Sequence, residues 1–181
     1  WDWTLGQEQF NWLQTTLQNS TASYKFVFSH QIVGGNGMSS PINQVNYGHG
    51  GVDSANFVEW GGNNTDGTTY TWATNRTGWG SQPIRQMMEA SGVTAFFHGH
   101  DHQYAYERLN GMVYQAVPSG SFSGSFGTYT TGDNSGNTIW ADSTEGPGHL
   151  KVTVSPTEAT VDFVRSGASS PVYSYTMLPA G

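Results

Sequence analysis

The chain of 181 residues contains no cysteine, so disulfide bonds and thiolate metal ligands are excluded. Charge is also scarce: Lys and Arg number 6 against 13 Asp and Glu, for a formal net charge of -7. A surface that binds the phosphate backbone of a nucleic acid needs clustered basic residues, and those of this chain are scattered. Nucleic acid is therefore not expected as a partner.

Long apolar runs are missing as well. No stretch approaches the ~18 consecutive apolar residues of a membrane-spanning helix. Aromatic side chains are plentiful, at 14% of the residues, and each large ring buries roughly 150–250 Å². We therefore expect one globular domain over residues 1–181, with a core built largely from Trp, Tyr and Phe.

The polar residues are mostly Thr, Ser, Asn, Gln and Gly, a composition common in secreted proteins. Three Asn-x-Ser/Thr sequons begin at Asn19, Asn63 and Asn75. The first residue is Trp1, so either a leader has been removed or the chain starts within a longer protein. From these features we expect a secreted, extracellular protein.

Hydrophobic periodicity predicts two helices and several strands. Residues 7–18 place Phe10, Leu13 and Leu17 on one helical face, and residues 83–91 predict a second helix. Strands are predicted at 24–29, 93–97, 112–117, 150–154, 160–164 and 172–177, with a hairpin joining the fourth to the fifth. This order predicts a mixed α/β domain with an antiparallel C-terminal tail.

Residues 34–80 are rich in Gly, Asn, Ser and Thr and have no clear periodicity, which is typical of a long insertion. Three tryptophans are spaced through it: Trp60, Trp72 and Trp79. They either line a substrate cleft or, the more ordinary interpretation, belong to a core that is short of aliphatic residues.

Histidines follow two of the predicted strands directly. His30 comes after one, and the turn containing His100 and His102 comes after another. Ligands bind at the carboxyl ends of strands in open α/β sheets, and neutral imidazole binds Zn, Fe and Mn. A bare His-x-His is by itself more often a solvated polar turn or a packed, hydrogen-bonded corner. Asp101, between the two histidines, either orients an imidazole or faces outward.

The residues around these histidines resemble the calcineurin-like metallophosphoesterases, including their purple acid phosphatase branch. Residues 5–13 (LGQEQFNWL) resemble the LGxxQxxWL helix of that family. Residues 26–30 (FVFSH) resemble the strand with its lone metal-binding histidine, and residues 96–104 (FFHGHDHQY) its GHxH signature. Similar segments continue in the same order at 50–52, 59–62, 76–80, 111–115 and 148–163.

The resemblance implies the back half of an α/β/β/α sandwich that holds two metal ions. In that family the metals clamp a phosphate ester for hydrolysis. The resemblance assigns His30 and His100 to one metal and His102 to the other, with Fe, Zn or Mn as the ions. The substrate would be a small-molecule phosphate ester, either a monoester or a diester.

The remaining histidines are given no metal-binding role. His98 is expected to pack or hydrogen-bond beside the site, and His149 to be structural. His49 is expected to be an ordinary loop residue.

The family's upstream ligand motifs, Asp-x-His, Gly-Asp and Asn-His, have no counterpart in this chain. Without a bridging carboxylate, neutral imidazoles should hold two metals weakly, so the chain alone is expected to be inactive. Three interpretations stay open. The chain is part of a phosphoesterase whose N-terminal half is a separate or cleaved chain, or it is a non-catalytic extracellular binding or structural module. The third is a mononuclear three-His metal site that activates water.

Overall fold

The computed structural model describes residues 4–30, 51–64, 66, 68–124, 129–132, 136–144 and 146–180. Short helices, mostly in the first half of the chain, precede most of the strands. The elements are, in chain order, α1 (Gln7–Asn19), β1 (Phe26–Ser29), η1 (Ser54–Asn56), α3 (Val58–Gly61), α4 (Trp72–Asn75), α5 (Ile84–Ala90), β2 (Ala95–His98), β3 (Ala105–Leu109), β4 (Met112–Ala116), β5 (Thr138–Ala141), β6 (Gly148–Val154), β7 (Ala159–Arg165) and β8 (Tyr173–Met177).

The larger sheet has five strands in the order β1-β2-β4-β3-β5. β1, β2 and β4 are parallel, whereas β3 is antiparallel to both of its neighbours. Every residue of β2 and β4 is buried, as expected for strands covered on both faces. Asn110 and Gly111 connect β3 to β4 with φ of 51° and 84°, the left-handed pair that a tight hairpin turn requires.

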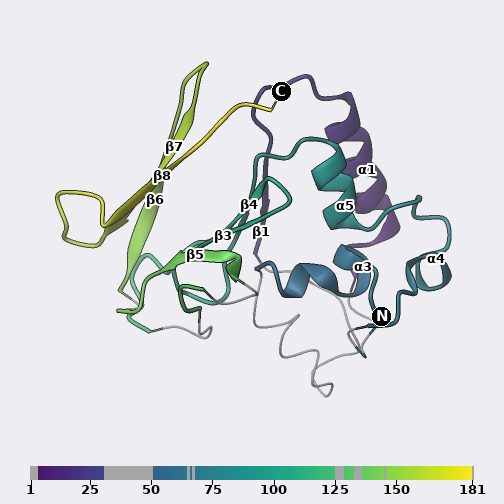
Figure 1. Cartoon of the computed structure of the whole chain (residues 1–181), viewed down its shortest axis with the longest axis horizontal. Helices are drawn as coiled ribbons and strands as arrows, with labels where there is room; N and C mark the ends of the chain where they lie inside the picture. Colours follow the sequence, from purple (N-terminus) through teal and green to yellow (C-terminus); the bar gives the residue numbers. More distant parts are fainter. Residues whose placement is uncertain are drawn as a thin grey trace.

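A different layer covers each face of this sheet (Figure 1). On one face α1 and α5 pack with Phe96 and Tyr114. On the other lies the antiparallel sheet β6-β7-β8, whose Val161 and Phe163 pack against Phe97. Helices, mixed sheet and second sheet make three layers of an α/β/β/α sandwich. The predicted mixed α/β class is therefore confirmed.

The predicted helices and strands are found close to their expected positions, and the 150–154/160–164 hairpin is β6–β7. Two strands were not predicted, β3 and β5. β3 carries Glu107 and Arg108 and so lacks an apolar pattern, and β5 is only 4 residues long. Both strands form because the open edge of β4 pairs with β3, which then pairs with β5.

The described part of the 34–80 insertion packs on the helical face of the sheet. Trp60, Trp72 and Trp79 are all buried there, and the ring centroids of Trp72 and Trp79 lie 5.7 and 5.3 Å from that of Phe10. The core interpretation of these tryptophans is thus confirmed. None of the described helices has the length and apolarity needed to cross a bilayer.

Candidate metal centre

The parallel register of β1 and β2 brings His30 next to the histidine turn. Ser29 is opposite His98, and the ladder continues one step further, where the Gly99 N–H donates to the His30 carbonyl at 2.8 Å. Both strands therefore end at the same edge of the sheet, which is where α/β folds place their ligands.

At this edge the imidazoles of His30 and His100 face each other. Nε2 of His30 and Nδ1 of His100 are 3.3 Å apart, and the ring planes are at 89° with centroids 5.3 Å apart. Two nitrogens held at ~2.0–2.1 Å by one tetrahedral metal would lie about 3.3–3.4 Å apart. The same separation suits a hydrogen bond between one ring N–H and the other ring nitrogen. The donor chemistry and spacing of this pair fit one metal ion.

Gly99 leaves room for the His30 ring. A Cβ built at residue 99 would lie 3.6 Å from His30 Nδ1 and 4.0 Å from its Cε1. These are van der Waals distances, so any side chain longer than a methyl group would compete with the imidazole for this space.

His102 stands apart from this pair. It is half-buried, and its ring packs edge-on against Phe122 with centroids 5.4 Å apart. Among the described residues, no three or more His, Asp or Glu side chains form a group that could hold a metal. The metal-binding roles of His30, His100 and His102 therefore stay a prediction.

The turn that carries the two histidines has an unusual backbone. His100 and His102 have φ of 74° and 61°, in the left-handed region. Histidine is enriched there relative to most side chains, yet the conformation costs about 1–2 kcal/mol per residue. The surrounding contacts must therefore hold this turn in place.

Those contacts come from the residues that alternate with the histidines. Asp101 is fully buried and accepts a hydrogen bond from the Tyr129 hydroxyl at 2.9 Å. The interpretation of Asp101 as an outward-facing residue is therefore wrong. Gln103, also buried, pairs its side-chain amide with the backbone of Tyr129. No motif assigned a role to Tyr129 or Gln103. The only sequence signal was that histidines alternate with Asp101 and Gln103 over residues 100–103.

Of the other histidines, only His98 has contacts that test its expected role. His98 is buried at the end of β2, and its ring stacks on Phe96 with centroids 5.7 Å apart, which confirms its packing role. His149 lies in β6 with an exposed side chain. His49 lies outside the described residues.

Two buried carboxylates act as links between segments. The Glu107 carboxylate on β3 accepts from the Val52 N–H at 3.0 Å and from the Thr138 hydroxyl at 2.9 Å. The Asp142 carboxylate forms an ion pair with Arg165, with Nε and Oδ2 3.2 Å apart. Burial raises the pKa of Asp142, but hydrogen bonds from Arg165 and Thr144 outweigh that effect and lower it overall.

A third carboxylate, Glu59, fastens the start of the chain to the insertion. It accepts from the Thr4 hydroxyl at 2.7 Å and the Leu5 N–H at 2.6 Å, and it pairs with Arg76. Its pKa is raised because burial outweighs these contacts. Among the described residues, none of these three carboxylates forms a metal-binding group with His30 and His100.

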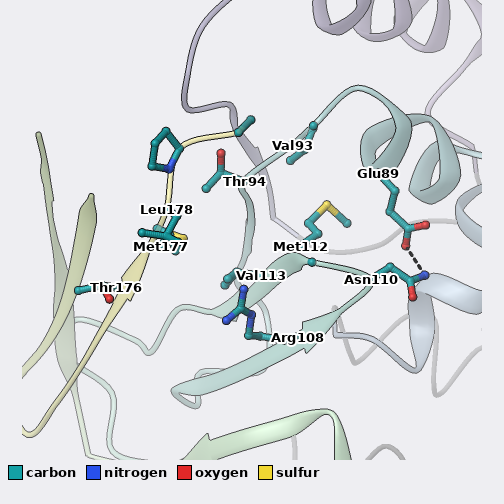
Figure 2. Close-up of a pocket in the computed structure, with 14 residues that line it drawn as sticks. Glu89, Val93, Thr94, Arg108, Asn110, Met112, Val113, Thr176, Met177 and Leu178 are labelled. Carbon is teal, nitrogen blue, oxygen red and sulfur yellow. Dashed lines mark hydrogen bonds between the residues drawn. The ribbon is translucent and has the colours of Figure 1, made fainter. Parts of the chain in front are cut away.

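A cavity of about 460 Å³ lies at the opposite end of β2 from the histidines (Figure 2). Its lining includes Val93 and Thr94, which precede β2, together with Arg108 and the chain after Met177. No predicted metal ligand lines it. A second, more apolar groove of about 320 Å³ runs between β1 and α1.

No protein-family model matches the chain, and no curated protein sequence matches it. Two of the solved structures that share its fold illustrate the likeness. One is GAP50, the anchor in the inner membrane complex of Plasmodium, with a TM-score of 0.58 at 13% identity over 97% of this chain and 43% of that one. The other is the purple acid phosphatase PPD1 from yellow lupin (Lupinus luteus) seeds, with 0.58 at 14% identity over 95% and 28%.

The chain therefore shares the fold of one part of each of these two structures. It spans less than half the length of both solved structures. At these identities the likeness establishes the fold and leaves the activity to be argued from the site.

Proposed function

We propose that this chain is the histidine-bearing part of a metal-dependent phosphoesterase that hydrolyses small-molecule phosphate esters. The observation that carries the proposal is the facing pair of imidazole nitrogens, 3.3 Å apart at the shared carboxyl edge of β1 and β2. A structural neighbour named as a purple acid phosphatase supports it.

The residues of this chain would supply imidazole ligands to the metal centre. His30 and His100 are assigned to one metal ion, and His102 to a second, with Fe, Zn or Mn as the ions. When bound, such a pair of metals supplies Lewis-acid chemistry to a phosphoryl group and lowers the pKa of water. The chain's own contribution is to orient the imidazoles through the strand register and the turn after β2.

The carboxylate ligands would come from a front half of the same fold, as a separate or cleaved chain. Both solved neighbours extend well beyond the part that this chain covers. β1 is an edge strand of the described sheet. Trp12, which is 61% exposed, lines the apolar groove between β1 and α1, and Phe28, which is 72% exposed, stacks on Phe97 on the opposite face of β1. An apolar strand laid along β1 would cover both rings.

The test is hydrolysis of p-nitrophenyl phosphate and bis-p-nitrophenyl phosphate by the natural polypeptide containing these residues, loaded with Fe, Zn or Mn. We expect turnover that falls at least about 100-fold in His30→Ala and in His100→Ala, because each removes one ligand. His149→Ala, which removes an exposed histidine of β6, is the matched control and should keep full activity. Turnover unchanged in His100→Ala, or absent from every metal-loaded form, would overturn the proposal.

A second candidate is a non-catalytic binding or structural module of the extracellular space. It is favoured by the absence of a three-ligand group among the described residues and by the likeness to GAP50, which is an anchor in the inner membrane complex of Plasmodium. This candidate predicts no metal-dependent turnover. The extracellular location itself stays a prediction from the composition.

A further inference from the structure

The turn after β2 alternates between two kinds of side chain. His100 and His102 are half-buried, whereas Asp101 and Gln103 are 0% and 1% exposed. Because the four residues are consecutive, any contact that fixes the two buried side chains also fixes the backbone from which the imidazoles project.

Tyr129 contacts both buried side chains. Its hydroxyl donates to Asp101 Oδ2 at 2.9 Å, and its backbone N–H donates to Gln103 Oε1 at 2.9 Å. In return, Gln103 Nε2 donates to the Tyr129 carbonyl at 2.8 Å. The Gln103 amide therefore pairs with the Tyr129 backbone as a neighbouring strand would. All three bonds are buried, where an interaction of fixed geometry is strongest.

Tyr129 is itself fixed from another direction. A Cβ built at Gly51 would lie only 3.1 Å from Tyr129 Cε1, so the ring lies against the backbone of residue 51. The tyrosine is 8% exposed and comes from a segment 26 to 28 residues further along the chain than the turn it contacts. It is therefore a packed anchor and not an extension of the turn.

The backbone conformation of the turn requires contacts of this kind. Both histidines are in left-handed conformations, with φ of 74° and 61°, which non-glycine residues keep only where the surroundings hold them. The Tyr129 hydrogen bonds hold the residue between the two histidines and the residue after them. Without those bonds, the turn is free to relax toward a more ordinary backbone and to swing both imidazoles.

We propose that Tyr129 is a positioning residue, which fixes the directions of the His100 and His102 imidazoles through Asp101 and Gln103. Only the purpose of this positioning, which is to present the imidazoles to a metal ion, rests on the proposed function. The positioning itself is a property of the metal-free chain.

The first test uses imidazole signals of the metal-free, ¹⁵N-labelled protein. In Tyr129→Phe, which removes only the hydroxyl, we expect the long-range ¹H–¹⁵N signals of His100 and His102 to shift. Those of His149, exposed on β6, should stay in place and serve as an internal control. Tyr70→Phe removes a hydroxyl from a tyrosine that is 52% exposed, and should shift none of them. Unchanged His100 and His102 signals in Tyr129→Phe would overturn the proposal.

The second test is titration with Co²⁺, followed by its visible absorption. We expect Tyr129→Phe to bind Co²⁺ at least about tenfold more weakly than the unaltered protein and with altered bands, as for other residues that orient metal ligands. Tyr70→Phe should match the unaltered protein. Equal affinity and equal bands in Tyr129→Phe would contradict the positioning role.

The two tests separate the two claims. Shifted imidazole signals in a protein that binds no Co²⁺ would support the positioning role and overturn the metal-dependent function. Unshifted signals in a protein that binds Co²⁺ would overturn the positioning role and support the metal-dependent function.

Discussion

At the residue scale, two different backbone features position the histidines of the candidate site. His30 is positioned by the parallel register of β1 on β2, which sets it beside Gly99. His100 and His102 depend on left-handed backbone angles that tertiary contacts must maintain. The first feature depends on strand pairing alone, whereas the second needs the loop that carries Tyr129.

Gly51 is a residue at which a small change should be felt, because two buried side chains lie against it. A Cβ there would overlap Oε2 of Glu107 and lie 3.1 Å from the Tyr129 ring. Because the Glu107 carboxylate is buried and hydrogen-bonded, it has little room to move. We expect Gly51→Ala to lower the free energy of unfolding by about 1–3 kcal/mol, measured by urea denaturation.

Gly120→Ala is the matched control, because a Cβ at that position would have no heavy atom within 4 Å. Its free energy of unfolding should change by no more than about 0.5 kcal/mol. Equal effects of the two alanines would show that the contact between Gly51 and Glu107 is not a close one.

Only part of the candidate site could be predicted from the sequence. The strand-end positions of His30 and His100 were visible, because His30 follows one predicted strand and His100 lies in the turn after another. The roles of Asp101, Gln103 and Tyr129 were not, because hydrogen bonds over 26 to 28 residues leave no pattern in a single sequence. Nothing local distinguishes a buried Asp101 from one that faces solvent.

At the element scale, polar side chains connect the strands with the loops between them. Arg165, at the end of β7, pairs with Asp142, which directly follows β5. The link ties the three-stranded sheet to the edge of the five-stranded one. Apolar periodicity predicted β6 and β7, but not β5, which depends on β3 for its pairing. Elements formed by such pairing are the ones that sequence patterns miss.

Removing this ion pair should change how stability depends on pH. Because the folded pKa of Asp142 lies below its ordinary value of 3.8, the pair stabilises the fold above that pH. The stabilisation is lost as the pH falls through the folded pKa. We expect Arg165→Met to reduce the free energy of unfolding by about 1–2 kcal/mol at pH 7, measured by urea denaturation.

The difference between Arg165→Met and the unaltered protein should shrink as the pH falls below 3.8, because Asp142 is then increasingly protonated in both. Lys151→Met removes the same charge from an exposed position on β6 and should change stability by no more than about 0.5 kcal/mol at either pH. A difference for Arg165→Met that is constant from pH 7 to pH 3 would contradict the role of Asp142.

At the scale of the whole molecule, the layers are helices, mixed sheet and second sheet (Figure 1). The candidate site lies where β1 and β2 end. The central strands β2 and β4 are covered on both faces, whereas β1 is an edge strand among the described elements. The most exposed aromatic rings of the described residues lie on opposite faces of β1: Trp12 lines the groove between β1 and α1, and Phe28 stacks on Phe97. A further strand paired with β1 would cover this exposed edge.

The groove beside β1 should bind an apolar dye in the 181-residue chain. We expect 8-anilinonaphthalene-1-sulfonate to fluoresce with the unaltered chain, and Trp12→Asp to reduce the signal by about half or more, because a charge on the rim opposes apolar binding. Val154→Asp places the same charge on β6, where the valine is 52% exposed, and should leave the signal unchanged. Equal loss in both variants would indicate that the dye does not report on this groove.

The central claim is that His30 and His100 hold a metal ion, and anomalous diffraction tests it most directly. Crystals grown with Zn²⁺ would be measured on both sides of the zinc absorption edge. The account predicts an anomalous peak within ~2.0–2.1 Å of both His30 Nε2 and His100 Nδ1. Crystals with zinc bound elsewhere, and with a direct hydrogen bond joining these two nitrogens, would contradict it.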